Sequence, residues 1–163
     1  MSEPRVTGLR SAEFSVPDLA ATKKFYEECW GLEAVADEGG AVYLRATGSE
    51  HHILALREGA EKRLLRINLA ALDKAAVEGL YENAKGLGAD VDAPEVISEP
   101  GGGFGFVFRD LDGRDYRISS DVAQHEARPM EADKPFKISH VVQNSSDRMA
   151  QRSEEHTSEL QSP

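Results

Sequence analysis

An internal repeat is the feature that most constrains what this chain can fold into. Residues 18–32 read DLAATKKFYEECWGL and residues 73–87 read DKAAVEGLYENAKGL, so the two segments align at an offset of 55 with seven of 15 positions identical. Each segment follows an apolar run that is typical of a β-strand. A repeat at fixed spacing indicates one supersecondary unit that is used more than once and cannot bury its apolar face alone.

The first unit is predicted to have the order strand, helix, three strands. Residues 9–16 alternate between apolar and polar side chains, Asp18 is placed to cap a helix, and Gly31 is placed to end it. Gly39-Gly40 and Gly48-Ser49 are turn sequences that separate the three short strands, which we expect at 33–36, 41–46 and 52–57.

The second unit repeats that order. A strand is predicted at 64–70 and a helix at 73–85, which Gly86-Leu87-Gly88 ends. Three further strands are expected at 95–98, 104–109 and 116–119. The fold class is therefore predicted as α+β, with two βαβββ units.

A third copy of the unit begins near the end of the chain. The segment 139–147 reads SHVVQNSSD and places Asp147 where the other copies have Asp18 and Asp73. Residues 122–136 contain two prolines, several charges and little periodicity, and are predicted as an interdomain linker. We therefore expect a complete domain at 1–121, a linker at 122–136 and the first strand of a truncated second domain at 137–151.

The last twelve residues are predicted to be an artefact. Residues 152–163 read RSEEHTSELQSP and resemble the translation of a common sequencing-library adapter at every position. Such a segment is excluded from fold reasoning. The natural chain is therefore expected to continue beyond about residue 151.

Composition excludes several classes of protein. The net charge of −10 argues against nucleic acid, which requires a basic face. No run reaches the length of a membrane span, and the N-terminus lacks the apolar core of a signal peptide. Cys29 is the single cysteine, so no internal disulfide can form. We expect a cytoplasmic protein with no nucleic-acid or membrane partner.

The paired βαβββ units, together with FYEECWGL at 25–32 and DLDGRDYRIS at 111–120, resemble the vicinal oxygen chelate superfamily. This superfamily includes glyoxalase I, the bleomycin- and fosfomycin-resistance proteins and the extradiol ring-cleavage dioxygenases. The resemblance covers residues 8–151. It implies an α+β fold in which the curled mixed sheets of the two βαβββ units form a cup around a divalent metal, with ligands from the first strand of each unit and the last strand of the second.

Carried over by register, these ligand positions are degenerate in the first domain. Seven residues before the repeated aspartate lie Ser11 and Arg66, and Arg117 stands at the last-strand position. Serine is a poor metal ligand, and guanidinium groups repel a cation. The resemblance therefore implies no metal of this type in the first domain.

The second domain begins differently, because His140 stands at the first-strand ligand position. A complete first domain without metal ligands, followed by a second domain that opens with a ligand histidine, resembles the arrangement of the two-domain extradiol dioxygenases. In these enzymes the N-terminal domain has no catalytic role and the C-terminal domain binds the metal. The chain is thus predicted to be the N-terminal, catalytically incomplete part of a dioxygenase that uses Fe(II), or Mn(II) or another divalent metal, with a small aromatic diol and O₂ as substrates. We expect the parent to be a homo-oligomer and this fragment to hold no metal.

Two alternatives remain open. The parent can instead be a non-oxidative member of the superfamily, either a glyoxalase-like lyase or isomerase or a small-molecule-binding protein of the drug-resistance type. Within the first cup, Arg66 and Arg117 either pair with Glu13 and other acids or together bind an anion. His51 and His52 are expected to point to opposite faces of a strand, which excludes a shared site.

Overall fold

The computed structural model of the protein describes residues 3–146. Several predictions fall outside the described residues. They concern Asp147, the last part of the predicted segment 137–151, which is residues 147–151, and the adapter-like segment 152–163. The first unit consists of β1 (Val6–Val16), α1 (Leu19–Trp30), β2 (Glu33–Glu38), β3 (Ala41–Arg45) and β4 (Leu54–Glu58).

The second unit repeats this order with one change. It consists of β5 (Arg63–Ala71), α2 (Lys74–Gly86), β6 (Asp90–Val91), β7 (Glu95–Val96), β8 (Phe104–Arg109) and β9 (Asp115–Ser120). The strand expected at 95–98 is found as the shorter β7, and β6 is an additional short strand that the sequence did not predict; both pair with β8. The remaining predicted elements are found with boundaries that differ by a few residues.

The repeated aspartates occupy equivalent places. The side chain of Asp18 accepts a hydrogen bond from Ala21 N at 2.9 Å, and that of Asp73 accepts one from Ala76 N at 2.8 Å. Each therefore caps the N-terminus of its helix, as the sequence predicts. Neither helix of the described chain is long and apolar enough to span a bilayer.

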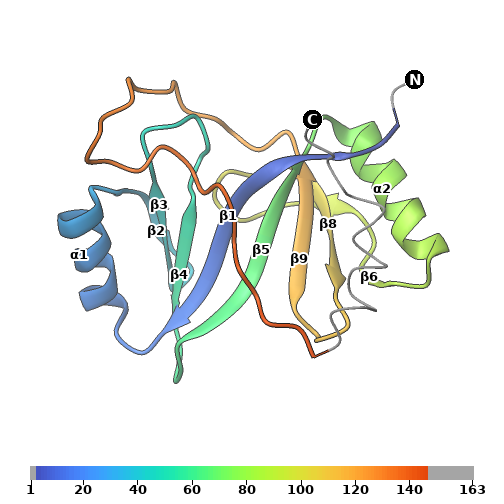
Figure 1. The fold of residues 1–163 in the computed structure, drawn as a ribbon, viewed down its shortest axis with the longest axis horizontal. Coiled ribbons are helices and arrows are strands. Elements are labelled where there is room, and N and C mark those ends of the chain that lie inside the picture. Colours follow the sequence, from blue (N-terminus) through green and yellow to red (C-terminus); the bar gives the residue numbers. More distant parts are fainter. Residues whose placement is uncertain (1–2, 147–163) are drawn as a thin grey trace.

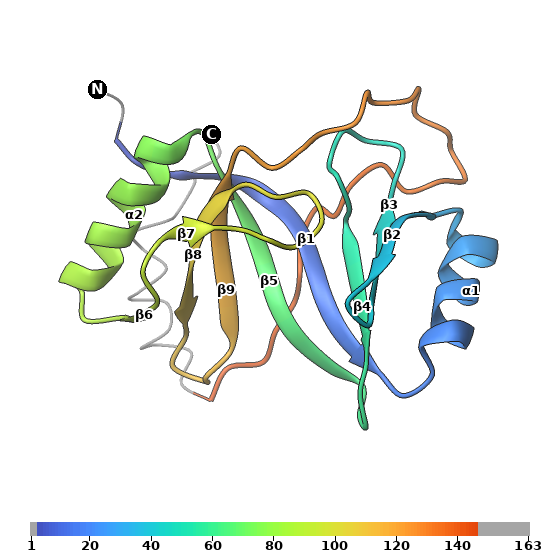
Figure 2. The ribbon, with the colours of Figure 1, turned by 180° about the vertical axis from the view of Figure 1, so that it is seen from behind.

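One continuous sheet joins the two units. Its order is β2-β3-β4-β1-β5-β9-β8-β6, with β7 also on β8. The central strands β1 and β5 are antiparallel, while β1–β4 and β5–β9 are parallel. The order on one side of the centre is thus mirrored on the other, which confirms an α+β fold of two like units (Figures 1 and 2).

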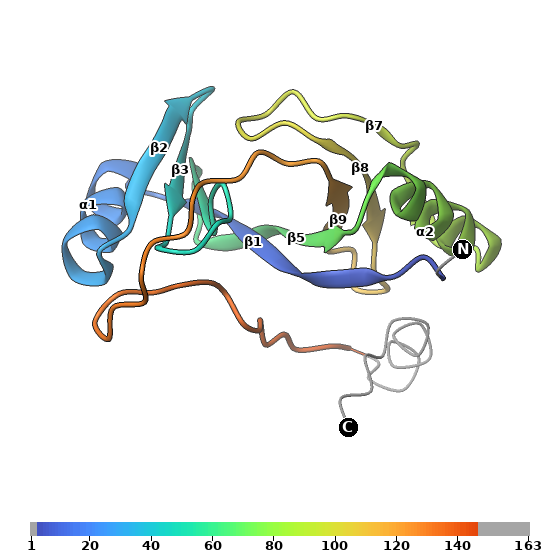
Figure 3. The ribbon, with the colours of Figure 1, turned by 90° about the horizontal axis from the view of Figure 1, so that it is seen from above.

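The sheet curls into a U with both helices outside it (Figure 3). The core is divided accordingly into two main clusters. One gathers around Leu44 and Leu56 and includes Tyr26 of α1; the other gathers around Val77 of α2 and Phe106 of β8. The apolar faces therefore point toward the helices, and the inside of the curl is left for polar side chains.

The segment after β9 is held against the first unit. Residues 122–136 contain no helix or named strand, and their backbone is bonded to the turn that precedes β4. His125 N donates to Ser49 O at 2.8 Å, Arg128 N donates to Thr47 O at 2.8 Å, and Gly48 N donates to Phe136 O at 3.0 Å. The role of this segment as an interdomain linker stays a prediction.

Residues 137–146 form no strand in this structure. They run as an irregular segment on the convex side of the sheet, between the two helices (Figure 3). Ile138 packs against the first core cluster, and the side chain of Gln143 accepts a hydrogen bond from Tyr116 OH at 2.6 Å. Their assignment to the start of a second domain stays a prediction.

The two-cluster core makes a prediction about stability. Phe106 is 2% exposed and makes an edge contact with Tyr81, whereas Phe25 is 50% exposed on α1. We expect Phe106→Ala to lower the free energy of unfolding by about 3–5 kcal/mol, because it removes a large buried ring and leaves a cavity. Urea unfolding measures the change, and Phe25→Ala is the matched control, expected to cost about 1 kcal/mol or less. Equal losses in the two variants would contradict this division of the core.

Candidate functional site

The three residues that the resemblance assigns to ligand positions lie close together in the structure. Ser11 on β1, Arg66 on β5 and Arg117 on β9 line one hollow on the concave face of the sheet. In the β1–β5 pairing Ser11 lies opposite Asn68, and in the β5–β9 pairing Asn68 lies opposite Arg117. Ser11, Arg66 and Arg117 are therefore neighbours on three adjacent strands.

The hydroxyl of Ser11 already has a hydrogen-bond partner on the adjacent strand. Its side chain is buried, with the residue 1% exposed, and its hydroxyl accepts a hydrogen bond from Asn68 Nδ2 at 3.0 Å. A neutral hydroxyl bonded to an amide offers little to a divalent cation.

The two arginines converge on a carboxylate that comes from a loop. Glu99 lies between β7 and β8 in a segment that passes over the open side of the curl (Figure 3). Arg66 Nη2 lies 3.1 Å from both carboxylate oxygens of Glu99, and Arg117 donates to them through both terminal nitrogens. Of the two alternatives for Arg66 and Arg117, the structure shows pairing with acids. Glu99 is one of these acids, and the sequence did not suggest it.

Glu13 extends these pairs into a network. It lies directly opposite Arg66 in the β1–β5 pairing, and its Oε2 accepts from Arg66 Nη2 at 2.7 Å. Its other oxygen accepts from Arg57 Nε, and Arg57 Nη2 donates to Tyr43 OH at 3.2 Å. Three guanidinium groups and two carboxylates therefore fill the floor of the cup.

The surroundings of Glu99 favour its ionised form. Burial acts to raise the pKa of Glu99, but the hydrogen bond from Arg117 and the charge of Arg66 outweigh it and hold the pKa at about 2. Burial raises the pKa of the nearby Tyr43 phenol. The cup is thus a site of fixed opposite charges at neutral pH, and its free volume of about 20 Å³ suffices for about one water molecule.

A divalent metal does not fit this donor set. Arginine cannot lose its proton under these conditions, so Arg66 and Arg117 present only positive charge to the cup. Within residues 3–146, no three His, Cys, Asp or Glu side chains are grouped so that they could hold a metal ion. His140 is exposed, and its Nδ1 lies 2.9 Å from Ser139 Oγ. Its assignment as a metal ligand stays a prediction.

The expectation for His51 and His52 is wrong. Both precede β4, which begins at Leu54, so they lie in a bend and do not alternate across a strand. Their Nδ1 atoms are 2.9 Å apart, and the ring of His51 stacks on that of His125 with centroids 5.4 Å apart. Burial and the charge of His51 lower the pKa of His52 to about 3.

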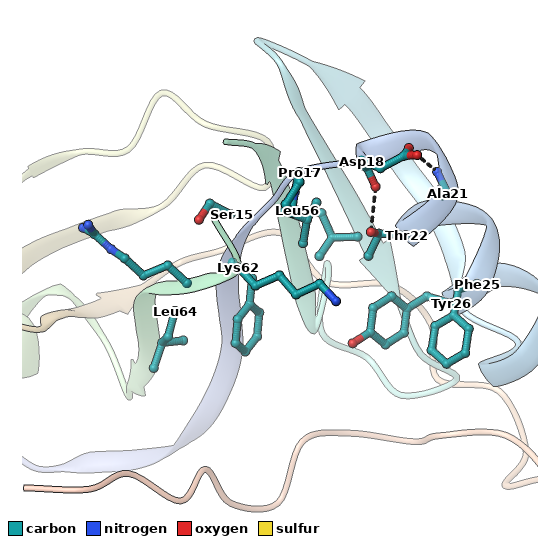
Figure 4. A pocket seen from close by; sticks show the side chains of 13 residues that line it. Ser15, Pro17, Asp18, Ala21, Thr22, Phe25, Tyr26, Leu56, Lys62 and Leu64 are labelled. Atoms are coloured by element: carbon teal, nitrogen blue, oxygen red, sulfur yellow. Dashed lines mark hydrogen bonds between the residues drawn. The ribbon is translucent and has the colours of Figure 1, made fainter. Parts of the chain in front are cut away.

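A larger groove lies on the other face of the sheet, between α1 and β1 (Figure 4). It has a volume of about 660 Å³ and is lined by Leu56, Leu64, Phe25 and Tyr26, among others, with Lys62 at its side (Figure 4). Phe14 lines this groove and its neighbour Glu13 lines the cup, as expected for successive strand residues. The groove holds no cluster of catalytic groups, so the cup is the candidate site.

Sequence reasoning found the positions of the cup but missed what fills it. Glu99 and Arg57 carry no local signal, because an isolated acid in a loop and an arginine in a strand are common surface residues. The sequence Pro100-Gly101-Gly102-Gly103 predicts a hairpin turn, and Glu99 stands directly before it. Its place beside a turn is the sequence signal that could have pointed to Glu99.

The network predicts a large effect at Glu13. Its side chain is 6% exposed and contacts two guanidinium groups. We expect Glu13→Gln to lower the free energy of unfolding by about 3 kcal/mol, because it removes the buried charge that pairs with Arg57 and Arg66. Chemical denaturation measures the loss. Glu28→Gln, which alters an exposed pair with Lys24, is the control and is expected to cost about 0.5 kcal/mol or less. Similar small losses in both variants would refute the structural role of the network.

The depressed pKa of His52 predicts acid sensitivity. The folded pKa of about 3 lies below the ordinary value of 6.5, so between these limits the unfolded chain binds a proton that the folded chain excludes. Stability is therefore lost as the pH falls below 6.5, by at most about 1.4 kcal/mol per pH unit from this group. Unfolding measured at about pH 7 and about pH 5 should show a smaller decline in His52→Asn than in the wild type or in His140→Asn. An unchanged decline in His52→Asn would exclude this residue as the cause.

Comparison with known proteins places the chain in a family. The family model described as the Glyoxalase/Bleomycin resistance protein/Dioxygenase superfamily matches residues 8–116. A manganese-dependent 2,3-dihydroxybiphenyl 1,2-dioxygenase of Geobacillus genomosp. 3 is 33% identical over 112 residues, which cover 68% of this chain and 36% of that protein.

Solved structures agree. The Mn(II)-bound glyoxalase from Novosphingobium aromaticivorans is 37% identical with a TM-score of 0.87, covering 91% of this chain and 51% of that one. Homoprotocatechuate 2,3-dioxygenase from Brevibacterium fuscum, in complex with 3,4-dihydroxyphenylacetate, is 22% identical with a TM-score of 0.76, covering 85% of this chain and 45% of that one, which supports the fold. The chain thus spans about half or less of each of these relatives. It belongs to the glyoxalase/bleomycin resistance protein/dioxygenase superfamily.

Proposed function

We propose that this chain is the N-terminal, non-catalytic part of a metal-dependent ring-cleavage dioxygenase that acts on a small aromatic diol with O₂. The observation that carries the proposal is a complete paired domain whose cup is filled by ion pairs among Arg66, Arg117, Glu13 and Glu99. A domain with this filling contributes stability and shape rather than chemistry.

The site of the chemistry is proposed to lie in a second paired domain that begins near residue 137. His140 repeats the register of Ser11 and Arg66 relative to the aspartate of each unit, and histidine is the commonest metal ligand among side chains. In the whole protein we propose His140 as one ligand of Mn(II) or Fe(II), with the other ligands beyond residue 151. The 33% identical relative is named as a manganese-dependent dioxygenase of an aromatic diol, which supports this choice.

A glyoxalase-like activity is the second candidate. The observation that favours it is the 37% identity to a protein described as a Mn(II)-bound glyoxalase, which extends over 91% of this chain. Both candidates predict the same ion-paired first domain, so the first domain does not discriminate between them.

Substrate assays on the protein with its natural downstream sequence separate the two candidates. Consumption of O₂ with 2,3-dihydroxybiphenyl in the presence of Mn(II) or Fe(II) is expected for the dioxygenase. Isomerisation of a 2-oxoaldehyde–thiol adduct without O₂ uptake would favour the glyoxalase and overturn the first proposal. His140→Ala should abolish metal binding and turnover in either case, and His125→Ala, outside the proposed ligand set, is the matched control.

The chain as given is expected to bind no divalent metal with stoichiometric affinity. Tight binding needs several converging ligands, and the cup offers guanidinium groups in their place. Titration calorimetry with Mn(II) and with anaerobic Fe(II) measures this directly. A one-to-one complex that survives His140→Ala would mean that the first domain holds a metal after all and would refute its assignment as non-catalytic.

A further inference from the structure

We propose that the cup of residues 6–120 is a binding site for a small carboxylate, and that Glu99 is an internal ligand that occupies it. This inference does not rest on the reaction proposed for the whole protein. In place of a cation site, the cup presents guanidinium groups arranged around one carboxylate.

The geometry around Glu99 is that of a bound ligand. Arg117 contacts both of its carboxylate oxygens, and Arg66 Nη2 lies 3.1 Å from each of them. Arg57 Nη2 approaches from a third direction at 3.8 Å. Planar guanidinium groups that meet a carboxylate from several sides form the usual recognition motif for carboxylates.

The charge balance of the cup requires an anion at this position. Arg57, Arg66 and Arg117 carry three positive charges, and Glu13 supplies one negative charge from the sheet. Without Glu99 these four groups would have a net charge of +2 in a largely buried position. The cup therefore attracts an anion whenever Glu99 is absent from it.

Buried donors in the cup also lack partners. The Nε atoms of Arg10 and Arg66 are buried and have no hydrogen-bond partner among the described residues, and the Arg10 side chain is only 8% exposed. Arg10 lines the same hollow. Unpaired buried N–H groups are costly, so the cup retains donors that Glu99 does not satisfy.

Glu99 can leave without unfolding the loop that carries it. The loop is anchored by backbone bonds, from Ile97 N to Gly103 O at 2.9 Å and from Ala123 N to Gly101 O at 2.8 Å. The Glu99 side chain is 30% exposed at the mouth of the hollow, so rotation about its own bonds releases the carboxylate. With Glu99 in place the free volume is about 20 Å³, so an external carboxylate must take its position.

The first test removes the internal ligand. Glu99→Ala takes away the carboxylate and should create a site for acetate, the probe, while Glu95→Ala removes an exposed acid of β7 as a matched control. At constant ionic strength, replacing chloride with acetate should raise the melting temperature of Glu99→Ala by roughly 4 °C or more at tenfold its dissociation constant. The wild type and Glu95→Ala should shift far less.

Two outcomes of this test would overturn the proposal. One is an acetate response of Glu99→Ala no larger than that of Glu95→Ala. The other is a response that persists in Glu99→Ala/Arg117→Met, because acetate would then bind outside the cup.

The wild type supplies a second test that does not depend on a variant folding. The Nε–H resonances of ¹⁵N-labelled arginines are followed as acetate replaces chloride, up to about 0.3 M. Saturable shifts confined to cup arginines, with an affinity at least tenfold weaker than in Glu99→Ala, are expected because Glu99 competes at high effective concentration. Absence of any saturable shift would refute binding to the native protein.

Discussion

The antiparallel pairing of β1 with β5 is the constraint on which the rest of this structure depends. This pairing joins the sheets of the two units, and it sets Ser11 opposite Asn68 and Glu13 opposite Arg66. Because side chains alternate across a strand, a shift of one residue would turn the charged residues of both strands into the apolar layers under the helices. The hydrophobic pattern of the repeat and the charge pattern of the cup therefore fix the same register.

Within this register, a few residue types decide what the cup can hold. Imidazole or carboxylate side chains at these positions could bind a cation, but the cup carries Ser11, Arg66 and Arg117. The two positive charges are instead paired with carboxylates, Glu13 from the sheet and Glu99 from a loop. Buried ion pairs recover their desolvation cost only with good geometry and saturated hydrogen bonding. With these residues, ion pairs take up the concave face of the sheet.

The sequence predicted what is local or repeated. Capping by Asp18 and Asp73, the order of strands and the convergence of the degenerate positions follow from short-range patterns and from the repeat. Glu99 could not be predicted, because its partners lie 18 and 33 residues away and its loop has no periodicity. The error at His51 and His52 has the same origin: the strand begins two residues later than its apolar pattern suggests, and alternation does not apply to a bend.

The two halves differ most in the layer between helix and sheet. Phe14 and Phe25 line the groove of about 660 Å³ beside α1, and their counterparts 55 residues later, Leu69 and Leu80, line a hollow of only about 150 Å³ beside α2. Larger side chains would be expected to leave less space, so the size of these residues does not explain the groove. Val77 is fully buried under α2, whereas Thr22 stands at the equivalent place in α1 and returns its hydroxyl to Asp18 O at 2.7 Å. The hydroxyl of Thr22 is thus bonded within its own helix, and α1 buries no residue completely. The helix of the second unit is therefore packed against its sheet through a buried valine, whereas the helix of the first unit stands beside an open apolar groove.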